Sequence, residues 1–334
     1  MKRYFMGIGV ALIVLFLVSS TVWAEVPRSA TLATHAVGSL YYAMGTGIAT
    51  VLSRHTPMIV RVQPFAGPPA WLPPMNTGET DMGVLTGADA VMSYKGIVLY
   101  KKPFKNTRIL VVGGALQLGF YVLKDSSIKT VKDLKGKRIP TDYPGTPIVG
   151  RSSTAALATA GLSYKDIVKV PVSDLMAGAR AFLEGRTDAG WHAVRSPAVK
   201  EANARKGGIR FIPVVSTPEG AKKMAEVYPG SFPGVMKAGS STGILSDTAV
   251  LTNDIYLVAS KDFSEEAAYQ VVKVLWDYNK ELGKAYRNLG SWRPGRMVSK
   301  AAFIPYHPGA IKFFKEKGKW NKDMDALQAK RLAE

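Results

Sequence analysis

Apolar and polar residues follow two different periods along this chain. Residues 29–35 and 58–65 are short segments of alternating or β-branched side chains, which predicts strands. Residues 39–55 place Leu40 and Met44 on one face at four-residue spacing, which predicts an amphipathic helix. Strand-like and helix-like segments follow each other steadily, and this alternation predicts an α/β fold.

The same alternation continues to the end of the chain. A loop rich in proline and glycine over residues 141–151 is expected to precede a helix of small residues over residues 152–161. Residues 187–194 predict a strand, and a helix follows from Pro197. Residues 264–288 predict one long amphipathic helix.

Two six-residue segments resemble each other. Gly78–Gly83 (GETDMG) and Gly185–Gly190 (GRTDAG) share the pattern Gly-x-Thr-Asp-x-Gly, and each precedes a predicted strand. Turns favour glycine and aspartate anyway, so the match alone is weak. Two similarly built α/β halves would nevertheless produce such a repeated pattern. In open α/β sheets, ligands bind beyond the carboxyl ends of the strands.

The first 24 residues differ from the rest. A basic start (MKRYF) precedes an apolar run (MGIGVALIVLFLV) and a short polar exit (SSTVWA). This order is typical of a secretory signal peptide, and we expect cleavage after Ala24. An uncleaved membrane anchor is the alternative, but its apolar run is shorter than a bilayer span.

The chain contains no cysteine and four histidines, His35, His55, His192 and His307. Without cysteine, neither a disulfide nor a lipid anchor at the cleavage site can form. The histidines are not paired at metal-ligand spacing, so we expect no metal site and no cofactor.

The formal net charge is +19, of which Lys2 and Arg3 carry two, so that cleavage leaves +17. Lysines and arginines are scattered, and no nucleic-acid motif is present, so small anions are the expected partners rather than nucleic acid. Nucleophile-elbow, phosphate-loop and zinc-hydrolase motifs are missing as well. This favours a binding protein over an enzyme, and no catalytic residue is predicted.

Residues 35–45 (HAVGSLYYAMG) form the first candidate site. A glycine turn leads from a strand into a helix that Ser39 is expected to cap, and the first N–H groups of a helix favour an anion. Tyr41 and Tyr42 point about 100° apart. We predict that one tyrosine packs inward and that Tyr42 faces the ligand; the plain alternative is a turn followed by two core aromatics.

The second half of the chain offers the counterpart. Thr146 supplies a hydroxyl, and Arg151 supplies a guanidinium suited to a carboxylate. After the next predicted strand, Trp191 offers an aromatic wall, His192 an imidazole and Arg195 a second cation. The ordinary alternatives are a solvated arginine and a half-buried histidine.

Several segments together resemble one family, the TAXI-type solute receptors of tripartite ATP-independent periplasmic (TRAP) transporters. The matching residues are Gly38, Ser39, Tyr41, Tyr42 and Gly45, then Gly78, Glu79, Asp81 and Gly83, then His307–Ile311 and Glu316–Gly318. The chain departs from the family at residues 66–76 (AGPPAWLPPMN) and at Arg195, where the family tends to small residues. Because proline is tolerated in the first turn of a helix, Pro73 and Pro74 predict a short or shifted helix there.

The resemblance implies a two-lobed periplasmic binding protein, type II-like, with the ligand cleft between its lobes. It implies that residues 25–118 and 252–334 form one lobe and residues 119–251 the other. It also implies a small organic anion, of carboxylate or amino acid type, that is delivered to integral membrane TRAP permease subunits. A receptor of an ATP-driven importer, a periplasmic enzyme on the same scaffold and a protein that adheres to anionic surfaces remain alternatives.

The candidate ligand-binding residues lie near predicted strand ends and helix starts. They are Ser39, Tyr42, Phe65, Thr86, Thr146, Arg151, Trp191, His192 and Arg195. We expect Ser39 and Thr146 to meet a carboxylate, an arginine to supply the charge, and aromatic side chains to enclose the apolar part of the ligand.

Overall fold

The computed structural model describes residues 26–334, so the expected signal peptide lies outside the described residues. The strands of this range are β1 (Ser29–Thr34), β2 (Ile59–Pro64), β3 (Met82–Thr86), β4 (Thr107–Leu123), β5 (Arg138–Asp142), β6 (Val168–Val172), β7 (Gly190–Ala193), β8 (Ile209–Phe211), β9 (Phe232–Met236) and β10 (Thr248–Ser260). The helices are α1 (Leu40–His55), α2 (Pro68–Asn76), α3 (Gly87–Lys95), α4 (Pro147–Ala158), α5 (Leu175–Leu183), α6 (Pro197–Arg205), α7 (Pro218–Val227), α8 (Glu265–Asp277), α9 (Asn279–Ala285), α10 (Pro308–Glu316) and α11 (Lys322–Ala333), with 3-10 turns η1 (Val131–Leu134), η2 (Arg287–Ser291) and η3 (Pro294–Arg296).

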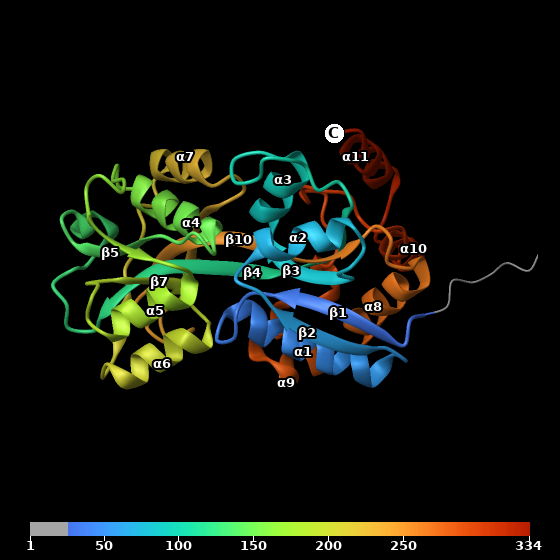
Figure 1. The fold of residues 1–334 in the computed structure, drawn as a ribbon, viewed down its shortest axis with the longest axis horizontal. Helices are drawn as coiled ribbons and strands as arrows, with labels where there is room; N and C mark the ends of the chain where they lie inside the picture. The colour runs from blue at the N-terminus through green and yellow to red at the C-terminus, as the bar shows by residue number, and fades with distance from the viewer. Residues whose placement is uncertain (1–25) are drawn as a thin grey trace, which may run out of the picture.

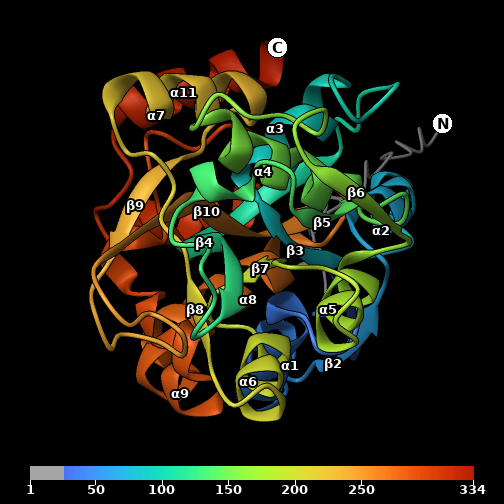
Figure 2. The same cartoon turned by 90° about the vertical axis from the view of Figure 1, so that its left-hand side faces the viewer.

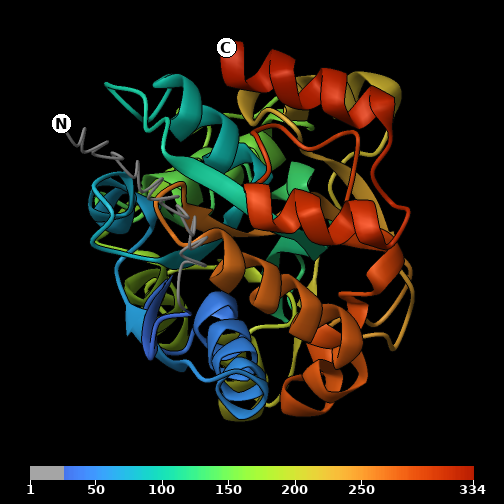
Figure 3. The ribbon, with the colours of Figure 1, turned by 90° about the vertical axis from the view of Figure 1, so that its right-hand side faces the viewer.

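Two long antiparallel strands, β4 and β10, run through the whole molecule and join two groups of elements (Figure 1). At one end the sheet continues from β10 through β3 and β1 to β2. At the other end β7 and β8 pair with β4, and β9 pairs with β10. We call the elements β1–α3 and α8–α11 the first lobe, and the elements η1–β9 the second lobe. Figure 2 views the molecule from the second lobe, and Figure 3 shows α8, α10 and α11 on the outer side of the first.

One type of hydrogen bond, from a backbone N–H group to an aspartate, occurs in both lobes. In the first lobe, Asp81 accepts the backbone N–H of Thr31 in β1 at 2.7 Å. In the second, Asp188 accepts the backbone N–H of Arg138 in β5 at 2.8 Å. Both pairs are 50 residues apart in sequence, and the two aspartates belong to the repeated Gly-x-Thr-Asp-x-Gly pattern. The repeated pattern therefore makes the same backbone contact once in each lobe.

Three predicted elements have different limits in the structure. The loop expected over residues 141–151 ends early, because α4 already begins at Pro147. The single helix expected over residues 264–288 is broken at Tyr278, whose ring stacks on His55 with the centroids 3.6 Å apart. The helix over residues 66–76 is short, as expected, but its two later prolines lie in its interior rather than in its first turn.

The centre of β4 packs closely on the C-terminal part of the chain. A Cβ atom at Gly113 would lie 2.2 Å from the buried ring of Trp292, so glycine allows the strand to approach this ring. Among residues 26–334, no helix has the length and apolar character needed to cross a bilayer.

Candidate functional site

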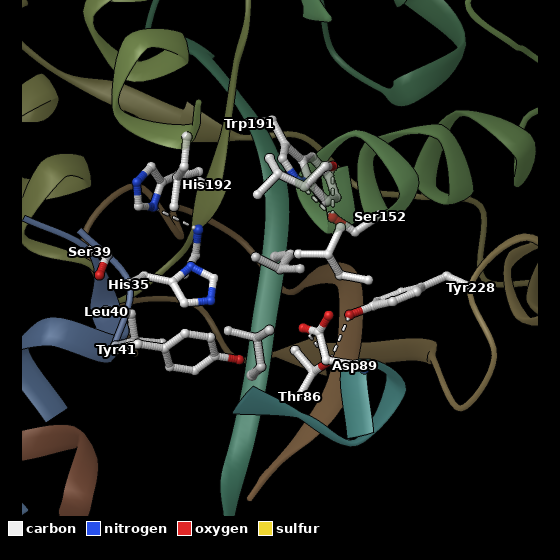
Figure 4. A pocket seen from close by; sticks show the side chains of 16 residues that line it. His35, Ser39, Leu40, Tyr41, Thr86, Asp89, Ser152, Trp191, His192 and Tyr228 are labelled. Carbon is white, nitrogen blue, oxygen red and sulfur yellow. Dashed lines mark hydrogen bonds between the residues drawn. The ribbon is translucent and has the colours of Figure 1, made fainter. Parts of the chain in front are cut away.

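A small cavity lies between the two lobes, against the middle of β4 (Figure 4). Its volume is about 40 Å³. The lining residues are His35, Ser39, Leu40, Tyr41, Thr86 and Asp89 from the first lobe, Leu116 and Leu118 from β4, and Ile148, Val149, Ser152, Leu175, Trp191, His192, Ala193 and Tyr228 from the second lobe. Both lobes therefore contribute to one site.

Four helices begin at this cavity. Leu40 opens α1, Asp89 lies in the first turn of α3, Ile148 lies in the first turn of α4, and Leu175 opens α5. Two of these helices belong to each lobe. Because the N-terminus of a helix carries partial positive charge, the four helix starts favour an anionic group in the cavity. They do so without a cationic side chain, since no lysine or arginine of the described residues lines it.

A hydrogen-bonded chain of side chains crosses from one lobe to the other. The Tyr228 hydroxyl of the second lobe donates to Thr86 Oγ1 at 3.2 Å, and Thr86 Oγ1 donates to Asp89 Oδ2 at 3.2 Å. The Tyr100 hydroxyl donates to Asp89 Oδ1 at 3.1 Å. Burial raises the pKa of the Asp89 carboxyl to about 7, although the hydrogen bonds from Tyr100 and Thr86 oppose the rise. Asp89 is the only carboxyl group that lines the cavity among the described residues, and it changes charge near neutral pH.

Three polar groups of the cavity have no hydrogen-bond partner among the described residues. These are His35 Nε2, His192 Nε2 and the Tyr41 hydroxyl. The Ala193 N–H donates to His192 Nδ1 at 2.9 Å, so the proton of the neutral ring lies on Nε2. Burial is the main cause that lowers the pKa of His35 to about 3 and that of His192 to about 4, so both rings are neutral at pH 7. Buried polar groups without partners are costly, and a ligand would satisfy them.

An apolar wall completes the cavity on the side of the second lobe. Trp191 is almost fully buried, and its Nε1–H donates to Ser152 Oγ at 3.2 Å. Figure 4 shows the hydroxyls of Tyr41 and Tyr228 pointing inward from opposite sides, with the ring of His35 near that of Tyr41. These last two rings meet edge to face with their centroids 4.6 Å apart. The site therefore combines neutral donors, one titrating carboxyl and an aromatic wall.

Residues 32–318 match the sequence profile of the NMT1-like family. The chain belongs to the NMT1-like family. The match spans both lobes of this NMT1-like protein.

Periplasmic binding proteins are among the solved structures that align with this chain. PhnD1 from Prochlorococcus marinus, in complex with methylphosphonate, aligns with a TM-score of 0.53 at 15% identity, over 88% of this chain and 99% of that one. The alkanesulfonate-binding protein SsuA from Xanthomonas axonopodis pv. citri, bound to MOPS, aligns with a TM-score of 0.46 at 18% identity, over 92% and 95% of the two chains. The likeness to PhnD1 shows that the NMT1-like protein has the two-lobed α/β fold of this class, as predicted from the sequence.

Four of the predicted site residues line the cavity of the NMT1-like protein: Ser39, Thr86, Trp191 and His192. Ser39 also caps α1, since its hydroxyl oxygen accepts the N–H of Tyr42 at 3.1 Å. Thr86 caps α3 in the same way through the N–H of Asp89 at 2.8 Å. These residues serve both the local fold and the cavity.

Three other predicted residues lie outside the cavity. Tyr42 does not line it, whereas Tyr41 does, because neighbouring residues of a helix point about 100° apart. Phe65 lies just beyond the end of β2, half-buried and away from the cavity. The Thr146 hydroxyl accepts the N–H of Leu175 at 3.0 Å, and so it ties the start of α4 to the start of α5.

The two predicted arginines also lie outside the cavity. Because α4 begins at Pro147, its residues Ile148 and Ser152 face the cavity, while Arg151 lies on another face and its Nε–H donates to the Val227 carbonyl. Arg195 contacts the side-chain oxygen of Gln117 and lines a separate groove. An unpaired guanidinium inside a closed cavity would lose its hydration, which explains why neutral donors occupy the site instead.

Sequence reasoning missed five polar residues of the site: His35, Tyr41, Asp89, Ser152 and Tyr228. His35 and Tyr41 belong to the segment that was singled out, but their direction depends on the turn between them. Asp89 is typical of the acidic residue in the first turn of any helix, so its burial had no signal in the sequence. Within residues 26–334, no group of three or more histidine or acidic side chains is placed to hold a metal ion.

Proposed function

We propose that this NMT1-like protein is a periplasmic solute-binding protein and not an enzyme. It captures a small organic anion, of carboxylate or amino acid type, between its lobes. It then delivers this solute to the membrane subunits of a TRAP-type secondary transporter. In this proposal residues 1–24 are a signal peptide that is cleaved after Ala24, residues 25–118 with 252–334 form the first lobe, and residues 119–251 form the second.

The observation that carries the proposal is the set of four helix starts around unpartnered polar groups in one inter-lobe cavity. A carboxylate would accept hydrogen bonds from His192 Nε2 and the Tyr41 hydroxyl, while the helix starts stabilise its charge. The cavity of about 40 Å³ is much smaller than the roughly 150 Å³ that holds a benzene molecule. The described cavity is too small for such a ligand, so in this proposal the lobes separate to admit and hold it.

The carboxyl group of Asp89 favours an amino acid over a simple carboxylate. It lies in the same cavity as the helix starts, and no cationic side chain neutralises it there. The ammonium group of an amino acid would supply the missing charge, while its carboxylate meets the neutral donors. An amino acid would thus pair with the Asp89 carboxylate through its ammonium group and with the neutral donors through its carboxylate.

Thermal unfolding in the presence of candidate solutes tests this proposal. A bound ligand raises the melting temperature in a concentration-dependent way. Glutamate and glutarate are a useful pair, because they differ only by the ammonium group. Asp89→Asn should weaken the binding of the amino acid by about tenfold and leave that of the matched carboxylate nearly unchanged. If a broad panel of amino acids and carboxylates shifts nothing, the proposal fails.

The arginines predicted from the sequence are tested separately. Arg151→Ala and Arg195→Ala should each leave the affinity for the cavity ligand nearly unchanged, if neutral donors and helix starts hold the anion. A large loss of affinity in either variant would instead support the prediction from the sequence that an arginine binds the anion. The other predicted residues outside the cavity, Tyr42, Phe65 and Thr146, stay predictions until their alanine variants are measured.

The transporter class is tested with reconstituted membrane subunits. A TRAP-type partner requires an ion gradient for uptake into proteoliposomes, whereas the receptor of an ATP-driven importer requires ATP. The enzyme alternative is tested by mass spectrometry, because a binding protein returns its ligand chemically unchanged.

A further inference from the structure

A second, larger hollow lies on the opposite face of β4 from the inter-lobe cavity. Side chains along a strand point alternately to its two faces. Leu116 and Leu118 line the cavity, whereas Ala115 and Gln117 line the second hollow. Its volume is about 460 Å³, which is large enough for a small organic molecule. The two sites therefore differ in both position and size.

This hollow is rich in positive charge. We call it the cationic groove, defined by Gln117, Arg195, Lys200, Arg287 and Arg296. Ser240, Ser241, Thr242, Asn288 and Ser291 add hydroxyl and amide groups to its lining. No aspartate or glutamate of the described residues lines it, so the charged side chains of its lining are all cationic.

Most of this charge is not neutralised within the described residues. Arg296 pairs with Asp254 at 3.1 Å, and Arg195 donates to the neutral side-chain oxygen of Gln117. Lys200 and Arg287 form no ion pair with a described carboxylate. Burial, and then the nearby charge of Arg287, lower the pKa of Arg195 below its usual range. The guanidinium groups thus repel each other, and an anion between them would relieve this repulsion.

The cations of the groove come from both lobes. Arg195 and Lys200 belong to the start of α6 and the turn before it, in the second lobe. Arg287 and Arg296 belong to η2 and η3, in the first lobe. One contact already joins these segments, since the Tyr286 hydroxyl donates to the Arg195 carbonyl at 2.9 Å. A ligand that fills the groove would therefore contact both lobes.

We propose that the cationic groove binds a small polyvalent oxyanion, with carboxylate or phosphate groups, that bridges the two lobes. Guanidinium groups bind such oxygens in a bidentate manner, and Lys200 adds the positive charge of an ammonium group. Leu40 lines both this groove and the inter-lobe cavity, so the two sites adjoin at the start of α1, but their polar residues differ. The proposal does not depend on the solute that the cavity binds.

Isothermal titration calorimetry at low ionic strength tests the proposal. Citrate and inorganic phosphate are titrated into the purified protein, with sodium chloride of equal ionic strength as the reference. The expected result is saturable binding at one site by citrate, by phosphate or by both. Lys200→Ala and Arg287→Ala should each weaken it by about tenfold, as the loss of one charged hydrogen bond predicts.

Two control variants remove the same charge from residues that do not line the groove. Lys206→Ala and Arg293→Ala should change the affinity by less than about twofold, because neither side chain contributes to the lining of the groove. An equal loss in groove and control variants would mean that only net charge matters, and would overturn the proposal. Absence of saturable binding beyond the chloride reference would overturn it as well. Asp89→Asn should leave citrate binding unchanged; a changed affinity in this variant would place the anion in the inter-lobe cavity instead and overturn the proposal.

Discussion

The sharpest prediction concerns the charge of Asp89. This carboxyl is fully buried and lies at the centre of the hydrogen-bonded chain between the lobes. Asp89→Asn keeps the shape of the side chain and removes its titration. The Tyr100 hydroxyl can still donate to the amide oxygen, so the variant imitates the protonated carboxyl.

The size and sign of the effect follow from the pKa. The pKa of Asp89 is about 7 in the folded chain and 3.8 for an ordinary aspartate. Between these values the folded chain holds a proton that the unfolded chain has released. The stability that this proton contributes is therefore present at low pH and is lost as the pH rises through 7. A difference of about three pKa units corresponds to ~4 kcal/mol.

Urea denaturation of the ligand-free protein at several pH values between 5 and 8 measures this effect. The free energy of unfolding of the wild-type chain, minus that of Asp89→Asn, should fall by ~3 kcal/mol over this range, because about two of the three pH units between 3.8 and 7 lie above pH 5. The buried histidines of the cavity act in the opposite direction. Their lowered pKa values contribute stability that is lost as the pH falls below 6.5. They are present in both chains, so they cancel in the difference.

Asp125→Asn is the matched control, since it removes one exposed carboxyl and the same formal charge. Its difference from wild type should vary little with pH. If the difference for Asp89→Asn is equally flat, Asp89 is ionised without cost in the folded chain. That result would refute the account of burial on which the assignment of an ammonium-binding group rests.

Three further predictions follow from the same structure. Tyr228→Phe removes the hydroxyl that donates to Thr86 across the lobes, and calorimetry should show the affinity for the cavity ligand reduced by about fivefold, or ~1 kcal/mol. Gly113→Ala forces a methyl group into the Trp292 ring, and urea denaturation should show a loss of about 1–3 kcal/mol, whereas Gly295→Ala, with no neighbour in reach, should change stability little. Circular dichroism should show stability falling as the pH drops from 6.5 toward 4, because the cavity histidines are neutral only in the folded chain.

The local signals of the sequence predicted much of the fold. Ser39 and the apolar period after it predicted α1 and its cap, and the last glycine of "ADAVMSYKG" predicted the end of α3, where Gly96 adopts a left-handed conformation. The repeated aspartates predicted two halves built alike. These features depend on neighbours within one turn or strand, so a single sequence carries them.

The features that the sequence did not predict depend on contacts between distant segments. No strand was predicted for the first part of β4, because Gly113 and Gly114 weaken the strand pattern. Glycine is needed at these positions because the ring of Trp292, far along the chain, packs against them. The choice between Tyr41 and Tyr42 depends on how α1 is rotated against the second lobe. The burial of Asp89 depends on Tyr228, which lies 139 residues later in the sequence and belongs to the other lobe.

The joining of the lobes by β4 and β10 has a mechanical consequence. No flexible loop separates the lobes along these strands, and both remain paired across the middle of the molecule, where their register shifts between Asp254 and Tyr256. Separation of the two lobes must therefore twist the paired strands β4 and β10. We expect this twist to be concentrated at the register shift, because the ladder of hydrogen bonds is irregular there. Because such a ribbon resists deformation, we expect the ligand-free protein to keep its lobes close together for most of the time.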